Sequence, residues 1–260
     1  MLLRRFARSL KDQNWTAILI EFALLVLGVF LGMQVSNWNQ DLAGQRLGRA
    51  YAARLGNDLG QDLASRRQLV AYYAAVLDSV ERTDALLADP RSDPKAVVAS
   101  AYRASEINLI PSVRATWDEI VSSGDTGLLP RGVARPLATY YAFDTARDIY
   151  SILLQSPYRH RVRNLIPLAM QKALRAGCSD VRDEAQQITG FMRDCNLDFD
   201  PKQVAATVAT LRADPVVREN LRYQYSDVYS AHANIQGDVA AIERALAALK
   251  GQAGAAGAPP

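Results

Sequence analysis

Few side chains in this sequence stand at spacings that support catalysis or metal binding. The two histidines, His160 and His232, are far apart, and neither has a second His or Cys at metal-ligand spacing. Asp118 and Glu119 are adjacent, so on a helix they point about 100° apart and do not form an acid–base pair. The G-x-S-x-G, H-E-x-x-H, P-loop and dinucleotide-binding motifs are all absent. We therefore expect a protein that is not an enzyme and that uses no metal or cofactor.

Two further clusters are open to more than one interpretation. His160 lies in the basic stretch YRHRVR, which is typical of a solvated helix face or of a face that meets an acidic neighbour. A set of tyrosines has helix-compatible spacings, which are usual in a core or an interface and are also compatible with the lining of a ligand pocket. The set comprises Tyr140, Tyr141, Tyr150, Tyr223, Tyr225 and Tyr229.

The two cysteines of the chain, Cys178 and Cys195, are too few for a four-ligand zinc site by themselves, and no C-x-x-C motif is present. In an oxidising compartment, two cysteines this close in sequence predict a disulfide, which would staple the turn between two helices. A pair of free buried thiols is the alternative.

Glu21 is a carboxylate near the start of the apolar run IEFALLVLGVFLGMQVSNWN. At about 100° per residue, Glu21, Gly28 and Gly32 share a narrow stripe of a helix. The two glycines form a G-x-x-x-G pair, which lets another helix approach closely. This pattern predicts a contact face for a partner helix in a membrane. Alternatively, Glu21 lies about one turn from the membrane edge and reaches water.

The apolar run is long enough to cross a bilayer. From Thr16 to Val35 every residue is apolar or small except Glu21 and Gln34, and about 20 helical residues span a hydrocarbon core of about 30 Å. Trp15 and Trp38 flank the run, where aromatic rings settle at membrane interfaces. A cleaved signal peptide would have small residues before its cleavage point, which are missing here. We expect an uncleaved signal anchor, with a buried core helix as the rival interpretation.

Basic residues near the span predict its orientation. Four basic residues precede the span, whereas three follow it at a greater distance from the membrane edge, so the positive-inside rule places the N-terminus in the cytoplasm. The rest of the chain is then expected outside the cytoplasm. The preceding residues are Arg4, Arg5, Arg8 and Lys11, and the following ones are Arg46, Arg49 and Arg54.

The composition indicates an all-α protein. The 260 residues are 49% hydrophobic and 22% charged, and no run of alternating Val, Ile and Thr is apparent. The net charge of +3 gives no argument for a nucleic-acid partner. Apolar residues from Asn39 to Ala88 follow spacings of three and four, which predicts a long amphipathic helix continuing from the span.

Four Asp-Pro pairs each predict a helix start, because Asp caps the free N–H groups and Pro is tolerated at the first helical position. They are Asp89-Pro90, Asp93-Pro94, Asp200-Pro201 and Asp214-Pro215. Trp117 is predicted to anchor the core, Gly124 to end a helix, and Pro167 to kink or divide one. The predicted helices cover about 94–107, 113–123, 133–155, 157–176, 180–194, 201–213 and 215–250.

The stretch IEFALLVLGVFLGMQVSNWNQ resembles the anchor of an uncharacterised bacterial family of single-span membrane proteins, a domain of unknown function. That family has a Glu early in the span, a Gly-rich run, a Gln and then an Asn-Trp-Asn motif. The matching residues here are Glu21, Gly28, Gln34, Asn37, Trp38 and Asn39, and looser matches occur at Thr116–Ile120, Ser123-Gly124 and Tyr140-Tyr141. The resemblance implies an envelope-anchored helical protein and no particular activity.

Four segments are expected: a cytoplasmic basic segment (1–15), a transmembrane signal anchor (16–36), a periplasmic helical domain (37–250) and a disordered tail (251–260). The interface residues would be Trp15, Asn37, Trp38 and Asn39. The expected function is binding, as a scaffold, accessory subunit or sensing module, with the bilayer and another membrane helix as partners. The alternatives are a subunit of a proton-driven complex that uses Glu21, and an anchored periplasmic enzyme.

Overall fold

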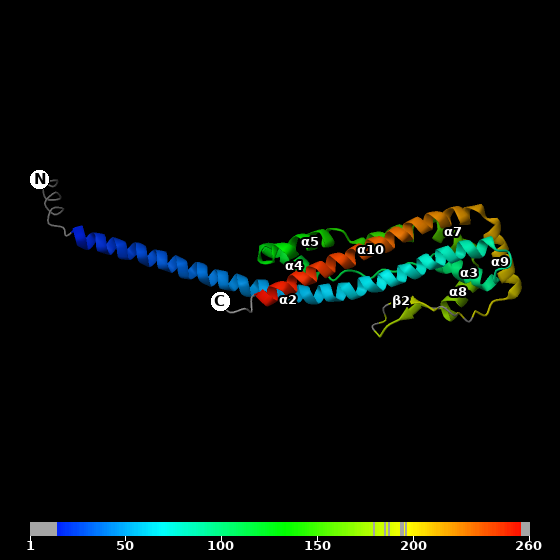
Figure 1. Cartoon of the computed structure of the whole chain (residues 1–260), viewed down its shortest axis with the longest axis horizontal. Helices are drawn as coiled ribbons and strands as arrows, with labels where there is room; N and C mark the ends of the chain where they lie inside the picture. Colours follow the sequence, from blue (N-terminus) through cyan, green and yellow to red (C-terminus); the bar gives the residue numbers. More distant parts are fainter. Residues whose placement is uncertain are drawn as a thin grey trace. The chain divides into compact units, whose positions relative to one another are not determined.

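The computed structural model describes residues 15–178, 180–184, 186, 188–192, 195 and 197–255. The chain divides into two compact units after Tyr51. In the described ranges all regular structure is helical except one two-stranded hairpin, which confirms the all-α class (Figure 1). In chain order the elements are α2 (Trp15–Ala88), α3 (Pro94–Arg103), α4 (Ala115–Ser123), η1 (Asp125–Leu128), α5 (Arg131–Ala142), α6 (Thr145–Leu154), α7 (Pro157–Leu165), α8 (Leu168–Gly177), β1 (Asp180–Arg182), β2 (Ile188–Phe191), α9 (Pro201–Ala213) and α10 (Pro215–Ala255).

The predicted long helix is continuous with the apolar run. Helix α2 has 74 residues and includes both the run and the amphipathic stretch that follows it. In the second unit its buried positions recur at helical spacing, as at Leu55, Leu59 and Leu69. This stripe packs against the rest of the helical bundle, so tertiary contacts stabilise the helix despite Gly56 and Gly60.

Three of the four Asp-Pro pairs start helices as predicted. Asp93 accepts hydrogen bonds from the backbone N–H groups of Lys95 and Ala96, and Asp200 caps α9 in the same way. Asp214 accepts from the N–H of Val216 at the start of α10. Asp89 was expected to start a helix, but its carboxylate accepts from the N–H of Arg91 in a turn. The prediction at Asp89 is therefore wrong, because the chain needs a reversal between α2 and α3.

Some helix boundaries differ from the predicted ones. The predicted helix 133–155 is two helices, because Asp144 accepts from the N–H of Arg147 and starts α6. Pro167 divides the region 157–176 into α7 and α8, as predicted. Gly124 ends α4 with a φ of 78°, a left-handed conformation that favours glycine. Helix α10 continues to Ala255, so it includes part of the expected disordered tail; residues 256–260 and 1–14 lie outside the described residues.

The predicted helix 180–194 is wrong, because this region forms the antiparallel hairpin β1–β2. Asp180 pairs with Phe191, Val181 with Gly190 and Arg182 with Ile188. The Cα atoms of Cys178 and Cys195 are 4.8 Å apart. A helix over the intervening residues would separate its ends by about 22 Å, whereas a hairpin returns the chain to its start. The cysteine pairing and the helix were therefore incompatible expectations.

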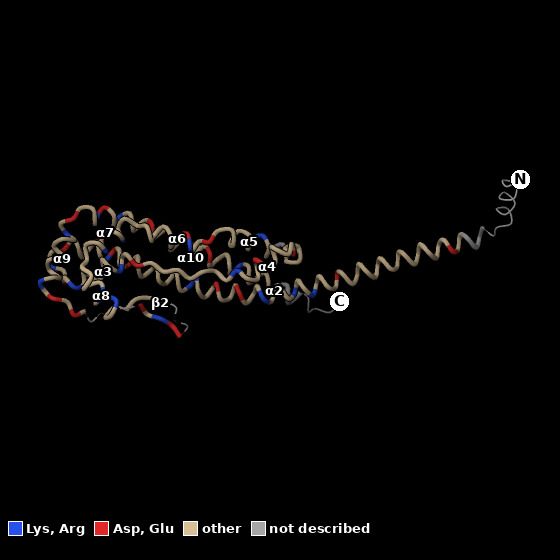
Figure 2. Tube along the Cα trace, turned by 180° about the vertical axis from the view of Figure 1, so that it is seen from behind, with Lys and Arg blue, Asp and Glu red and all other residues tan. Residues whose placement is uncertain are grey.

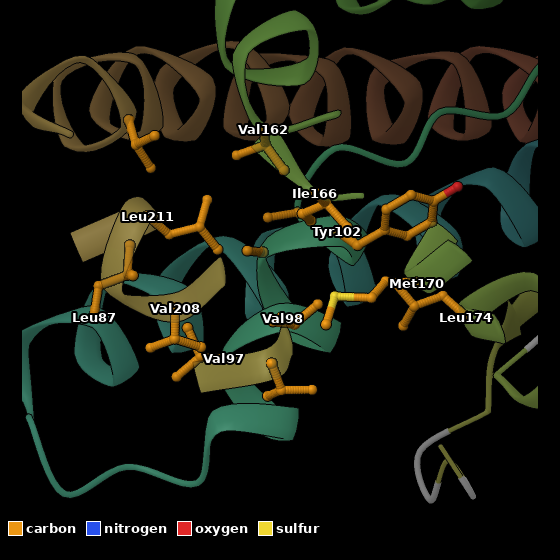
Figure 3. Packing of buried hydrophobic residues seen from close by; sticks show 14 of the residues in the cluster. Leu87, Val97, Val98, Tyr102, Val162, Ile166, Met170, Leu174, Val208 and Leu211 are labelled. Carbon is orange, nitrogen blue, oxygen red and sulfur yellow. The ribbon is translucent and has the colours of Figure 1, made fainter. Parts of the chain in front are cut away.

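Among the described residues, two buried clusters contribute to the core of the second unit. Figure 3 shows the first cluster, in which Val98 of α3, Ile166 beyond α7 and Val208 of α9 converge with residues of α2, α8 and α10. The second joins Leu69 and Tyr73 of α2 to α6 and α10. Helix α10 runs beside the part of α2 after residue 52, and α5, α6 and α7 pack on α10 (Figure 1).

Candidate functional site

The apolar stretch of α2 is exposed from Leu19 to Val35. An 18-residue window near the N-terminus has a mean hydropathy of 2.0, and none of it is buried inside the protein. Figure 2 shows this stretch of the trace almost without charged residues. A core helix would bury such a surface against other elements. By length and composition, this helix could cross a membrane.

The predicted contact residues Glu21, Gly28 and Gly32 all lie on this exposed helix. Among the described residues, and apart from the neighbouring backbone of the helix itself, a Cβ atom added at Gly28 or Gly32 would meet no other atom within 4 Å. The predicted interface residues Asn37, Trp38 and Asn39 are also helical and exposed, and Trp15 is the first residue of α2. On the described part of α2, the two glycines of the stripe therefore leave room for close approach.

A buried ionic network ties α2 to α5, α10 and the segment before α4. Arg66 is 1% exposed, and its guanidinium donates to the backbone oxygen of Ile110 at 2.9 Å and to the Ser112 hydroxyl. Its Nε lies 3.4 Å from Oδ2 of Asp238 on α10. One helical turn before Arg66, buried Asp62 accepts from the N–H of Val113 at 2.8 Å. The single cation thus connects segments that are distant in the sequence.

The carboxylates of this network are costly to bury. Burial raises the pKa of Asp62, and hydrogen bonds from Val113 and Tyr140 only partly oppose that shift. Burial also raises the pKa of Asp238. A raised carboxyl pKa means that the folded state binds the proton more tightly than the unfolded state does. The free energy of unfolding is therefore expected to fall as the pH rises from the ordinary pKa of aspartate to the raised pKa of these two groups. The guanidinium of Arg66 limits that loss.

The cysteine pair lies where α8 meets the hairpin. Cys178 follows α8 directly, and Cys195 lies four residues after β2. The two cysteines are at disulfide distance from each other. Arg103, the last residue of α3, donates to the sulfur of Cys178 at 2.7 Å and to the backbone oxygen of Met192. Its guanidinium also lies 5.1 Å from the ring centre of Phe191. Through these contacts Arg103 connects the hairpin to α3.

A cavity of about 180 Å³ opens beside this pair. Three arginines and two carboxylates contribute to its lining, from α3, α8, the hairpin and the segment after α3. The residues that line it are Tyr102, Arg103, Glu106, Leu174, Arg175, Cys178, Asp180, Arg182 and Phe191. Sequence reasoning missed this cavity, because its charges come from segments that are separate in the sequence and meet only in the folded chain.

Further arginines lie behind the cavity wall. Arg163 of α7 forms an ion pair with Glu106 at 3.2 Å, and its guanidinium lies 4.3 Å from the ring centre of Tyr102. Arg159 donates to the backbone oxygen of Ser105. Burial lowers the pKa of both Arg103 and Arg159, which indicates that nearby negative charge does not fully compensate them.

The basic stretch YRHRVR meets acidic residues, and Tyr140 and Tyr141 are buried in the core. Arg163 meets Glu106, and Arg161 meets Asp214, so the stretch faces acidic neighbours as one interpretation proposed. Trp117 is buried and stacks on Tyr141 at 5.4 Å between ring centres, which confirms it as a core residue. The exposed tyrosines of α10 are Tyr223, Tyr225 and Tyr229. Within the described ranges no group of three or more His, Cys, Asp or Glu could hold a metal ion.

Comparison with protein-family models, curated proteins and solved structures finds no match for this chain. Its own structure defines a helical protein that has, among the residues described, one candidate membrane-spanning helix. The features that bear on function are the exposed apolar stretch of α2, the network around Arg66 and the cavity beside the Cys178–Cys195 pair.

Proposed function

We propose that this chain is a single-pass protein of the bacterial inner membrane, with its N-terminus in the cytoplasm and residues 37–250 in the periplasm. It acts by binding, as a scaffold, an accessory subunit or a sensing module. The observation that carries the proposal is the apolar window of α2, no part of which is buried inside the protein. Exposing this much apolar surface to water is unfavourable, whereas a bilayer accommodates it.

Two other features support the proposed location. Basic residues precede the apolar stretch at closer range than those that follow it, which favours a cytoplasmic N-terminus. Cys178 and Cys195 lie at disulfide distance, and disulfides persist in compartments such as the bacterial periplasm. The resemblance of the Asn-Trp-Asn region to a family of bacterial single-span proteins points to the same place.

In the membrane, the stripe of Glu21, Gly28 and Gly32 contacts a second helix, either from another copy of this chain or from a different protein. Both glycines are open to close approach, and small residues at this spacing let two backbones pack closely in lipid. Glu21 would face that partner, since an ionisable side chain in a span usually faces protein. A proton-driven complex remains the second candidate, because a carboxylate in a span can carry protons.

The topology predicts which reporters work. A reporter fused after Lys250 is expected to be active only if it functions in the periplasm, because the basic N-terminal segment is retained in the cytoplasm. Paired fusions of a periplasm-dependent and a cytoplasm-dependent reporter, made at the same residue, measure this directly. Activity of the cytoplasmic reporter, or a mature chain that begins near Asn37, would contradict the anchor.

Bulky residues on the proposed contact face should separate the helices. Gly28→Ile and Gly32→Ile keep the span apolar, so membrane insertion should persist while crosslinking to the partner decreases by about tenfold or more. Crosslinking yield in native membranes is the measurement. Val26→Ile, about 160° from Gly28 around the helix, is the matched control and should crosslink as wild type does. Crosslinking yields equal to that of the wild type in both glycine variants would refute the contact face.

Glu21→Gln separates the two candidate functions. The amide keeps the size and hydrogen-bonding capacity of the side chain but cannot take up and release a proton. A binding protein should therefore retain its crosslinking and its deletion-complementing activity, whereas a proton-carrying subunit should lose activity and keep its crosslinks. Loss of complementation with unchanged crosslinking would favour the proton-driven complex.

A further inference from the structure

The cavity beside the cysteine pair has an excess of positive charge. Arg103, Arg175 and Arg182 line it, against the carboxylates of Glu106 and Asp180. Arg159 and Arg163 stand behind the wall, next to Ser105 and Glu106. Three guanidinium groups therefore line a partly enclosed space with two carboxylates, and two more lie next to it. Charges in such a space interact more strongly than in water.

The two carboxylates of the lining already have cationic neighbours. Glu106 pairs with Arg163 at 3.2 Å, and Asp180 lies 3.9 Å from Arg182. Arg175 lies beside the Tyr102 hydroxyl. Glu106 and Asp180 also attract Arg103 and Arg175. Two carboxylates are thus shared among more guanidinium groups than they can neutralise, and an additional anion would neutralise part of the remaining positive charge.

We propose that this cavity binds a small oxyanion, a carboxylate or phosphate compound, through the guanidinium groups of Arg103, Arg175 and Arg182. Guanidinium groups donate two parallel hydrogen bonds to the oxygens of a carboxylate or phosphate. The cavity of about 180 Å³ equals the volume of about six water molecules, which suits a compound of a few heavy atoms. Phe191 and Leu174 supply apolar contact for a short carbon chain.

Ligand binding at this position would connect three elements. Arg103 ends α3, Arg175 lies in the last turn of α8, and Arg182 ends β1. An anion held by all three would fix the hairpin against the two helices, since it would replace repulsion among the arginines with shared bonds. The inference rests on the proposed binding role and gives that role a ligand class.

Calorimetric titration of the full-length protein in detergent micelles tests the site. Sodium phosphate and sodium succinate are the two probes, each titrated at constant ionic strength set with sodium chloride. We expect one molar equivalent of at least one probe to bind. The double variant Arg175→Gln/Arg182→Gln should weaken that binding by at least about tenfold, because each bond to a charged group contributes appreciably.

Arg91→Gln is the matched control, since the Arg91 side chain is 93% exposed and lies outside the cavity. It removes one positive charge, as each single variant of the cavity does, and should leave the affinity unchanged. Far-UV circular dichroism checks that each variant is folded, and the two single variants serve as the test if the double variant is not. No binding of either probe by the wild type, or equal weakening by Arg91→Gln, would overturn the proposal. Such a result would not change the outcome of the crosslinking test of the membrane face. Failure of the ligand proposal can therefore be distinguished from failure of the proposed membrane function.

Discussion

Arg66→Met is expected to destabilise the helical domain by about 3–5 kcal/mol, which is the usual cost of breaking a buried ion pair by removing one partner. Methionine has a similar length but cannot donate to the oxygens of Ile110 and Ser112. It would also leave buried Asp62 and partly buried Asp238 without their cation. The measurement is the free energy of unfolding from urea titration in a mild detergent, followed by far-UV circular dichroism.

The adjacent residue supplies a control of the same type. Arg67 pairs with Glu243 at 2.7 Å, but its side chain is 62% exposed, so Arg67→Met should cost only about 0–1 kcal/mol. Adding Asp238→Asn to Arg66→Met removes one uncompensated charge and should recover part of the loss. If Arg66→Met costs no more than Arg67→Met, the network around Arg66 does not stabilise the domain.

Removing the disulfide is expected to lower the free energy of unfolding by about 3 kcal/mol. The cysteines are 17 residues apart in sequence, and a crosslink that closes a loop of this length restricts the unfolded chain by about that amount in the chain-entropy model. The comparison is between the oxidised wild type and the double variant Cys178→Ser/Cys195→Ser in urea titrations. Reductant should destabilise the wild type and leave the double variant unchanged.

Mass spectrometry of the exported protein checks the premise of that prediction. Under non-reducing conditions an alkylating reagent should label neither Cys178 nor Cys195. Labelling of both thiols would mean that the crosslink does not exist in the cell, and the two unfolding curves should then coincide. Since Arg103 contacts both sulfur atoms and the hairpin, loss of the crosslink should also expose the hairpin to proteases.

Most of the helical framework could be predicted from local signals. The Asp-Pro pairs at Asp93 and Asp200 start helices because the cap and the proline act within one turn. Pro167 divides two helices for an equally local reason. The start of α6 at Asp144 was missed, because the aspartate there has no proline beside it and the apolar spacing continues across the break.

The hairpin shows where local signals were insufficient. Residues 180–191 have no sustained alternation, so their sequence favours neither state strongly. The short distance between Cys178 and Cys195 excludes a helix in this region, since a helix between them would hold them far apart. Both expectations were available from the sequence, and only their geometric conflict excludes the helix.

The sequence by itself determined the apolar stretch of α2, the stripe of Glu21, Gly28 and Gly32, and the all-α class. Each of these depends on composition and spacing within one helix, which the residue order specifies directly. Only the tertiary structure decided that Arg66 is a buried cation and that Arg103, Arg175 and Arg182 share one cavity. The physical reason is that burial and the grouping of charges depend on which distant segments pack together, and no local spacing encodes that packing.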